Sequence, residues 1–145
     1  MHINHVVKNE YEEIVEIWEK SVRATHTFLL EEDINFFKPL ILNEFLAAVE
    51  LRCVKDDEGD IHGFLGVAEG NIEMLFIAPE SCKKGIGKLL LNFAIDKLGA
   101  RKVDVNEQNL NALEFYQHMG FAVVNRSPVD GFNKPYPILH MELQS

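Results

Sequence analysis

"MLFIAPESCKKGIGKLLLNFAI", residues 74–95, is the stretch that decides the fold. An apolar run stops at Pro79, two glycines and three lysines follow within residues 82–88, and apolar residues at helical spacing resume at Ile86. A strand that ends in a glycine loop and enters a helix presents unpaired backbone N–H groups to an anion. Glycine has no Cβ, so the backbone can approach such a ligand closely. The stretch therefore predicts a phosphate-binding turn between a strand and a helix.

Two common phosphate-binding motifs do not fit this loop. A P-loop requires Gly, four residues and then Gly-Lys-Ser/Thr, but Leu89 follows Gly87-Lys88 and Cys82 stands five positions before Gly87. A dinucleotide fingerprint requires a third glycine where Leu90 stands. For the loop taken alone, a plain helix entry with solvated lysines remains an open alternative.

Composition limits the classes of protein that remain. The chain has 145 residues, 47% of them hydrophobic, and a formal charge of −9, which indicates one soluble domain over residues 1–145. This charge disfavours a nucleic-acid partner and is compatible with a cationic acceptor. With no membrane-length apolar run, no signal peptide and only two cysteines, we predict a cytoplasmic protein without a membrane partner, monomeric or homodimeric.

The apolar period changes along the chain and predicts the order of elements. The first half predicts a strand at residues 2–7, a helix at residues 10–24, and a helical region at residues 31–50 that Pro39 kinks or divides. Three strands are then expected within residues 51–78.

The second half continues with helices that end at glycines. A helix from Lys84 is expected to stop at Gly99, and a helix from Asn109 to Met119 is expected to stop at Gly120. Strands are expected at residues 101–106, 121–126 and 137–143. The order β-α-α-β-β-β-α-β-α-β-β predicts an α/β fold with a mixed sheet and helices on both faces.

A second motif, "NLNALEFYQHMGF", occupies residues 109–121. Together with residues 74–95 it resembles the GNAT acyl-CoA N-acyltransferase superfamily, in which a strand, a glycine loop and a helix are followed by an N-x-x-A-x-x-F-Y-x-x-x-G-F segment. "SVRATHTFL", "DVNEQN" and "GFNKPYP" resemble the small bacterial YjaB-like branch. The matched residues are Leu75, Phe76, Ile77, Gly85, Gly87, Asn109, Ala112, Phe115, Tyr116, Gly120 and Phe121.

The resemblance implies a GNAT-like fold and acetyl transfer from acetyl-CoA to a primary amine on a small molecule, a peptide N-terminus or a protein lysine. No metal is expected, because the six histidines lack metal-ligand spacing. Cys82 departs from the family, which has Arg or Gln there; a packed loop position is expected for it. The resemblance implies that the cosubstrate contacts Leu75, Phe76, Ile77, Lys83, Lys84, Gly85, Ile86, Gly87, Lys88, Asn109, Ala112 and Tyr116.

Two residues are predicted to carry the chemistry. Tyr116 is the expected general acid, since a phenol stays protonated near neutral pH and can donate to a departing thiolate. Its alternative is an ordinary aromatic on the face of Ala112 and Met119. Glu73 is the expected base, on one strand face with Leu75 and Ile77, where partial burial raises its pKa. Its alternative is a surface carboxylate.

Two interpretations remain open for each of two further residues, Asn109 and His26. Asn109 is either a plain N-cap or a support for the cosubstrate, and both roles can coexist. His26 is expected near the acceptor groove by resemblance, and an ordinary polar loop position is favoured for it. At the level of the whole chain, a non-catalytic acyl-CoA sensor is the alternative to an enzyme.

Overall fold

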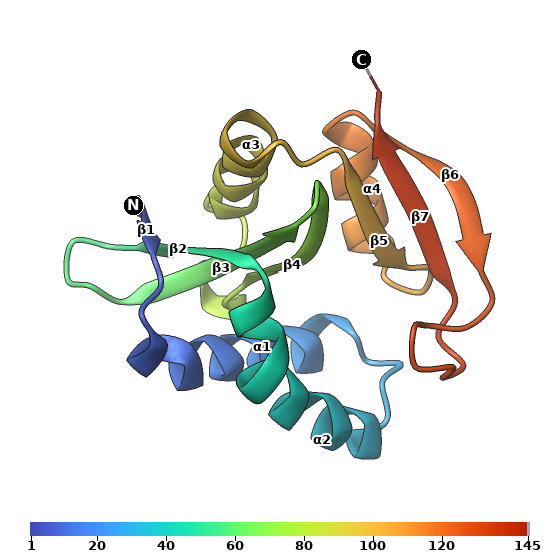
Figure 1. The fold of residues 1–145 in the computed structure, drawn as a ribbon, viewed down its shortest axis with the longest axis horizontal. Helices are drawn as coiled ribbons and strands as arrows, with labels where there is room; N and C mark the ends of the chain where they lie inside the picture. The colour runs from blue at the N-terminus through green and yellow to red at the C-terminus, as the bar shows by residue number, and fades with distance from the viewer. Residues whose placement is uncertain (145) are drawn as a thin grey trace.

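The computed structural model describes residues 1–144, which form a seven-stranded sheet in the order β1-β2-β3-β4-β5-β7-β6. All neighbouring strands are antiparallel except β4 and β5, which are parallel. The predicted mixed sheet is therefore confirmed (Figure 1). The strands are β1 (His2–His5), β2 (Glu50–Lys55), β3 (Ile61–Ala68), β4 (Asn71–Ile77), β5 (Lys102–Asn106), β6 (Phe121–Ser127) and β7 (Ile138–Leu143).

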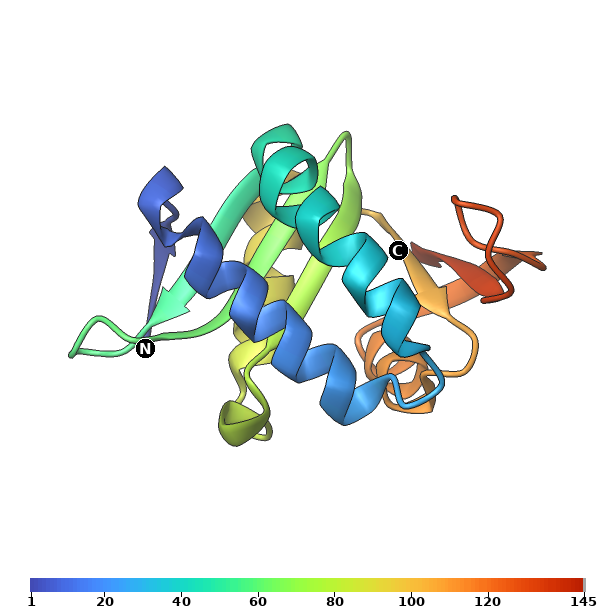
Figure 2. The same cartoon turned by 90° about the horizontal axis from the view of Figure 1, so that it is seen from below.

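Helices cover both faces of the sheet. On one face, α1 (Tyr11–Thr25) and α2 (Glu31–Leu40) pack with residues of β2, β3 and β4 around Phe64. On the other face, α3 (Ile86–Leu98) and α4 (Leu110–His118) pack around Leu65, Leu90 and Met141. Figure 2 shows α1 and α2 running across β2 to β4, while β6 and β7 extend beyond them. The sheet thus separates two hydrophobic cores.

The helix boundaries follow local signals. Gly99 and Gly120 have φ of 69° and 99°, so each adopts the left-handed conformation that ends a helix. Pro39 lies in the last turn of α2 and does not separate two helices. A π-helical segment, η2 (Ile41–Phe45), follows directly. The remaining short segments are 3₁₀ turns: η1 (Lys8–Glu10), η3 (Leu46–Ala48) and η4 (Pro79–Ser81).

The two parallel strands in the middle of the sheet stay together for a short distance. β4 pairs with β5 only at Asn71 with Lys102 and at Ile72 with Val103. The rest of the β4 edge, from residue 73 to residue 77, has no partner strand on that side, and the two strands diverge in Figure 1. None of the helices in residues 1–144 combines the length and apolarity that a bilayer-spanning segment requires.

Candidate active site

The glycine loop enters α3 with a left-handed turn. Lys83 and Gly85 have φ of 68° and 79°, and the first backbone hydrogen bond of the helix runs from Leu89 N to Gly85 O, at 3.0 Å. The N–H groups of residues 85–88 donate to no acceptor within residues 1–144. These unpaired donors at a helix N-terminus are suited to an anion.

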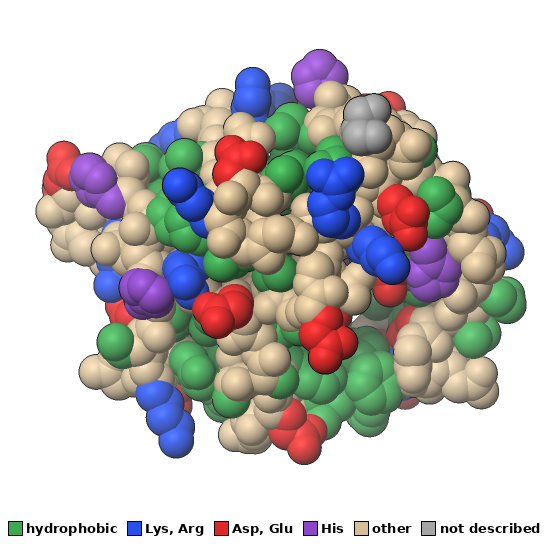
Figure 3. Space-filling model, turned by 45° about the horizontal axis from the view of Figure 1, so that its top comes forward, with side chains coloured by type: hydrophobic (Ala, Val, Ile, Leu, Met, Phe, Trp, Pro, Cys, Tyr) green, Lys and Arg blue, Asp and Glu red, His purple; other side chains and the backbone are tan. Residues whose placement is uncertain are grey.

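The side chains of the glycine loop differ in their exposure to solvent. Lys83, Lys84 and Lys88 are exposed, whereas Ile86 is buried against the sheet. On the face seen in Figure 3, Lys and Arg side chains are interspersed with Asp and Glu side chains, so this face is not uniformly basic. The expectation that Cys82 is packed is wrong. Its side chain is exposed, with Sγ 3.8 Å from the Ala78 carbonyl oxygen.

Glu73 occupies a β-bulge. Gly66 pairs with Met74 and Val67 pairs with Ile72, so Glu73 is the extra residue on β4. The prediction that it shares a face with Leu75 and Ile77 is therefore wrong, because the bulge breaks the alternation. Leu75 and Ile77 pack in the α3 core, whereas Glu73 lies at a cavity on the opposite face.

The environment of Glu73 suits a base. The residue is exposed at the rim of the cavity, yet enclosure of the carboxyl group raises its pKa above the ordinary value. The negative charges of Asp104 and Glu69 raise this pKa further. The predicted direction is confirmed. A carboxylate with a raised pKa holds a proton more strongly, which favours proton uptake during a reaction near neutral pH.

Tyr116 is buried on α4, on the α3 side of the sheet. Its ring lies 5.2 Å from the Phe115 ring and 5.6 Å from the Phe121 ring, centroid to centroid. Burial raises the pKa of its hydroxyl, which makes no hydrogen bond within residues 1–144 and is not fully enclosed. The phenol is therefore protonated at neutral pH and free to donate.

Asn109 links the start of α4 to the end of α1. Its Oδ1 accepts from Ala112 N at 3.2 Å, so the predicted N-cap is confirmed, and its Nδ2 lies 3.2 Å from His26 Nε2. His26 Nδ1 in turn lies 2.9 Å from Thr25 Oγ1, which donates to the Ser21 carbonyl. Because Asn109 Nδ2 is a donor, His26 Nε2 accepts and the ring is neutral. Burial lowers the pKa of His26 to about 4.

A cavity of about 290 Å³ lies between α1, α2, β4 and the segment that connects β6 to β7. Its wall is largely apolar and includes six aromatic residues, and its polar lining residues are His26, Glu73, Asn106, Asp130 and Tyr136. No lysine or arginine of residues 1–144 lines it. The aromatic lining residues are Trp18, Phe37, Phe45, Phe76, Phe132 and Tyr136.

The connecting segment is held to α2 by a buried ionic group. Asp33, with 6% of its surface exposed, accepts from the Tyr136 hydroxyl and lies 2.7 Å from Lys134 Nζ. These two donors lower the pKa of Asp33. Lys134 also lies 4.5 Å from the centre of the Phe36 ring. The cavity wall on this side is thus fixed in place.

The predicted site residues fall on two sides of the sheet. The α3 side holds Leu75, Ile77, Ile86, Ala112 and Tyr116 in one core. Glu73 and Phe76 lie on the other side, at the cavity. The sequence did not single out Asn106, a lone asparagine at a strand end, and favoured a plain loop position for His26; both residues line the cavity. Residues 1–144 contain no cluster of His, Cys, Asp or Glu side chains that could hold a metal ion.

The sheet, the glycine loop and the aromatic cavity define a class of protein. A family model described as an acetyltransferase (GNAT) domain matches residues 29–144. The chain therefore belongs to the GNAT acetyltransferase family and is an acyltransferase.

Individual relatives show to which branch of the GNAT family the chain belongs. The chain is 37% identical over 132 residues to the peptidyl-lysine N-acetyltransferase YjaB of Salmonella typhimurium, covering 91% of this chain and 90% of that one. Its fold is similar to the solution structure of apo-form YjaB from Escherichia coli, with a TM-score of 0.86, 34% identity and coverage of 97% and 95%. A Thermoplasma acidophilum PaiA N-acetyltransferase structure shares the fold at a TM-score of 0.73 and 23% identity, covering 97% of this chain and 98% of that one. The YjaB-like branch is confirmed.

Proposed function

We propose that this protein transfers the acetyl group of acetyl-CoA to a primary amine, and that the amine enters through the aromatic cavity. One observation carries this proposal: the unpaired edge of β4 runs between the glycine loop and the cavity. A cosubstrate bound along this edge would have its phosphates at the loop and its acyl group near the cavity. The names of the YjaB relatives point to peptidyl-lysine as the acceptor.

The cosubstrate would be held mainly by backbone groups. The free N–H groups of residues 85–88 would bind its pyrophosphate. The open edge of β4 at Leu75, Phe76 and Ile77 would pair with the amides of its pantetheine arm, as a strand would. Related structures support coenzyme A as the bound group: the Thermoplasma acidophilum protein was solved with coenzyme A, and yncA of Salmonella typhimurium with acetyl-CoA.

The proposed transfer uses one proton acceptor and one proton donor. The neutral amine attacks the thioester carbonyl carbon, so that a C–N bond forms and the C–S bond breaks. Glu73 takes the proton that the amine loses, directly or through a water molecule, and Tyr116 gives its hydroxyl proton to the departing thiolate. A backbone N–H near Ile77 would stabilise the negative oxygen of the intermediate. Glu73 then releases its proton to the medium and the Tyr116 phenolate takes one from it, which restores both groups.

A panel of amines tests the proposal. The protein is incubated with acetyl-CoA and with small amines, peptides that have free N-termini, and peptides whose only amine is a lysine side chain. Release of free thiol and the mass of the acetylated product are measured. We expect thiol release that depends on both substrates and is fastest with lysine peptides. Coenzyme A binding without thiol release across the panel would favour the acyl-CoA sensor instead.

Two further expectations belong to this proposal. We expect the protein in the cytoplasm, since both of its cysteines, Cys53 and Cys82, are free thiols. We also expect a monomer or a homodimer, which size-exclusion chromatography with light scattering would distinguish from larger assemblies.

A further inference from the structure

Asn106 ends β5 and carries a polar atom that has no partner. Its Oδ1 is fully enclosed and accepts no hydrogen bond within residues 1–144, the one enclosed side-chain nitrogen or oxygen of that range without a partner. The residue pairs with Ile138 of β7, and both line the aromatic cavity. A buried acceptor without a donor destabilises the fold, because it has lost its hydrogen bonds to water and gained none in return. Such a cost suggests that a donor arrives with a ligand.

Asparagines elsewhere in the chain show the contrast. Asn109 uses both atoms of its amide, accepting from Ala112 N and donating toward His26. Asn125 accepts from Arg126 N. Asn106 is therefore unusual among the asparagines of residues 1–144, and the residue lines the cavity.

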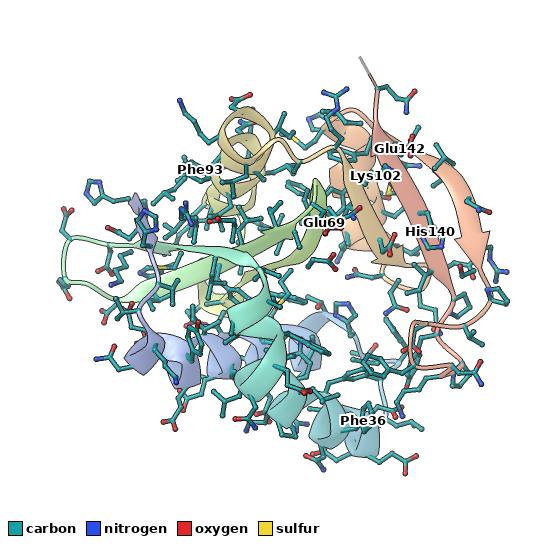
Figure 4. The ribbon with its side chains drawn as sticks, viewed as in Figure 1. Phe36, Glu69, Phe93, Lys102, His140 and Glu142 are labelled. Atoms are coloured by element: carbon teal, nitrogen blue, oxygen red, sulfur yellow. The ribbon has the colours of Figure 1, made fainter. Side chains whose placement is uncertain are left out.

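The charges around the cavity indicate what kind of group would donate a hydrogen bond to Asn106 Oδ1. Glu73 and Asp130 line the cavity, and no lysine or arginine of the described chain does. Lys134, on the segment that forms part of the wall, lies 2.7 Å from Asp33, and Lys102, at the opposite end of β5 from Asn106, lies 3.8 Å from Glu142 on β7 (Figure 4). A cavity with carboxylates and no cation favours a positively charged donor over a neutral or anionic one. An ammonium group satisfies both requirements.

The rest of the wall indicates what carries this ammonium. The aromatic rings of Trp18, Phe37, Phe76 and Phe132 make the wall apolar, so it favours an unbranched methylene stem over a polar one. Aromatic ring faces also attract a cation. The cavity therefore suits a primary amine at the end of an apolar stem, as in a lysine side chain.

We propose that Asn106 binds the acceptor amine, with Oδ1 receiving one of its N–H groups, and that the acceptor is a primary amine on an unbranched apolar stem. This inference rests on the proposed acetyl transfer. Asn106 and Glu73 come from the two strands that diverge, β5 and β4, and both line the cavity. The amide would hold the nitrogen while the bound ammonium loses one proton to the medium; the neutral amine then attacks and Glu73 takes the proton released in the attack, which makes Asn106 a determinant of acceptor specificity.

The test replaces the amide by a side chain of similar size. Asn106→Leu removes the acceptor atom, and Asn106→Asp keeps an oxygen in its place. Asn92→Leu is the matched control, because Asn92 is an exposed residue of α3 outside the cavity. With Nα-acetyl-lysine methylamide as the amine, Asn106→Leu should raise its KM about 10- to 100-fold, the effect of losing one hydrogen bond to a charged group. The KM for acetyl-CoA should be unchanged.

A binding measurement separates this inference from the proposed reaction. Trp18 is the single tryptophan and lines the cavity, so its fluorescence reports occupancy directly. Nα-acetyl-lysine methylamide should perturb this fluorescence, and Nα-acetyl-norleucine methylamide, which lacks the amine, should bind at least 10-fold more weakly. Asn106→Leu should remove this preference, while Asn106→Asp and Asn92→Leu should keep it. If no amine is acetylated but this pattern holds, the proposed function fails and the inference stands.

Three results would overturn the inference. The first is an amine KM and amine affinity in Asn106→Leu equal to those of the unmodified protein. The second is an equal rise in the KM for acetyl-CoA, which would assign Asn106 to the cosubstrate. The third is a loss of the amine preference in Asn106→Asp, which keeps the oxygen and should keep the preference. This result also decides the matter if circular dichroism shows that Asn106→Leu does not fold.

Discussion

Asn109 Nδ2 lies 3.2 Å from His26 Nε2, so a contact between residues 83 positions apart joins the N-cap of α4 to the end of α1. The same asparagine caps the helix that carries Tyr116. His26 also lines the cavity, next to Phe28 and Phe76, whose ring centres lie 5.3 Å and 6.4 Å from its own. The contact therefore connects the cavity to the helix with the expected proton donor.

Protonation of His26 should destabilise the fold. The folded pKa of about 4 lies below the ordinary value near 6.5, so between these values the unfolded chain binds a proton that the folded chain does not. The free energy of unfolding should therefore fall as the pH drops from about 6.5 to 4, by at most about 1.4 kcal/mol per pH unit from this group. Urea unfolding at several pH values measures the slope.

His26→Gln isolates the contribution of this histidine. The variant should lose the part of the slope that His26 causes, so its stability should change less between pH 6.5 and pH 4. His118→Gln is the control for the substitution itself, because His118 is exposed on α4 and does not line the cavity. Equal slopes in all three proteins would show that His26 is protonated as easily in the folded state as in the unfolded state.

Tyr116→Phe should lower turnover without loosening the fold. The hydroxyl has no hydrogen-bond partner within residues 1–144, so its removal leaves no buried group unpaired. If Tyr116 protonates the leaving thiolate, kcat should fall about 10²- to 10⁴-fold. Thiol release measures kcat, and calorimetric titration with coenzyme A checks binding, which should stay within about twofold. Tyr11→Phe on α1 is the control and should keep full activity; full turnover in Tyr116→Phe would contradict the assignment.

Glu73→Gln should flatten the acid side of the pH–rate profile. A base must be ionised, so kcat/KM should fall as the pH drops through the raised pKa of Glu73. Removing a neighbouring negative charge should lower the pKa of Glu73 and so move the acid limb of the pH–rate profile to lower pH. The move should be larger for Asp104→Asn than for Glu69→Gln, since Asp104 raises this pKa more.

The profile is recorded with acetyl-CoA and a lysine peptide between pH 5 and pH 9. Glu114→Gln, at an exposed position on α4, is the control that should leave the acid limb in place. An unchanged limb in Glu73→Gln would remove Glu73 from the reaction, and the limb would then belong to the amine or to another group.

Much of the fold could be predicted because its signals are local. Helical spacing located α1, α3 and α4, and the glycines at 99 and 120 marked two helix ends. The bulge at Glu73 could not be predicted, because it depends on how β4 aligns with β3, and a single extra residue exchanges the two faces of the strand. A pattern read along one strand contains no information about that alignment.

The site was partly predictable for a similar reason. The glycine loop and the Tyr116 helix are continuous segments, so their motifs are visible in the sequence. The cavity is assembled from α1, α2, β4, β5 and the segment before β7, which lie far apart along the chain. Only the structure distinguishes Asn106 from the other asparagines, because it shows that the enclosed oxygen of this residue has no donor. Its position at the end of a strand carries no such signal.

Gly87→Ala should separate stability from cosubstrate binding. A Cβ at this position would lie 3.5 Å from the Phe115 ring, an ordinary contact, and alanine favours a helix over glycine by about 0.5–1 kcal/mol. The variant should therefore melt at the same temperature or slightly higher without ligand. If the backbone at Gly87 must approach a pyrophosphate closely, the added methyl group should weaken coenzyme A binding about 10-fold or more.

Gly85→Ala, unlike Gly87→Ala, should destabilise the fold without ligand. Nothing lies within 4 Å of a Cβ there, but φ is 79°, so alanine should cost about 1 kcal/mol or more through backbone strain. Thermal melts with and without coenzyme A measure both quantities, since a ligand that binds only the folded state raises the melting temperature with its affinity. A coenzyme A shift in Gly87→Ala as large as in the unmodified protein would mean that the phosphates do not approach this part of the loop.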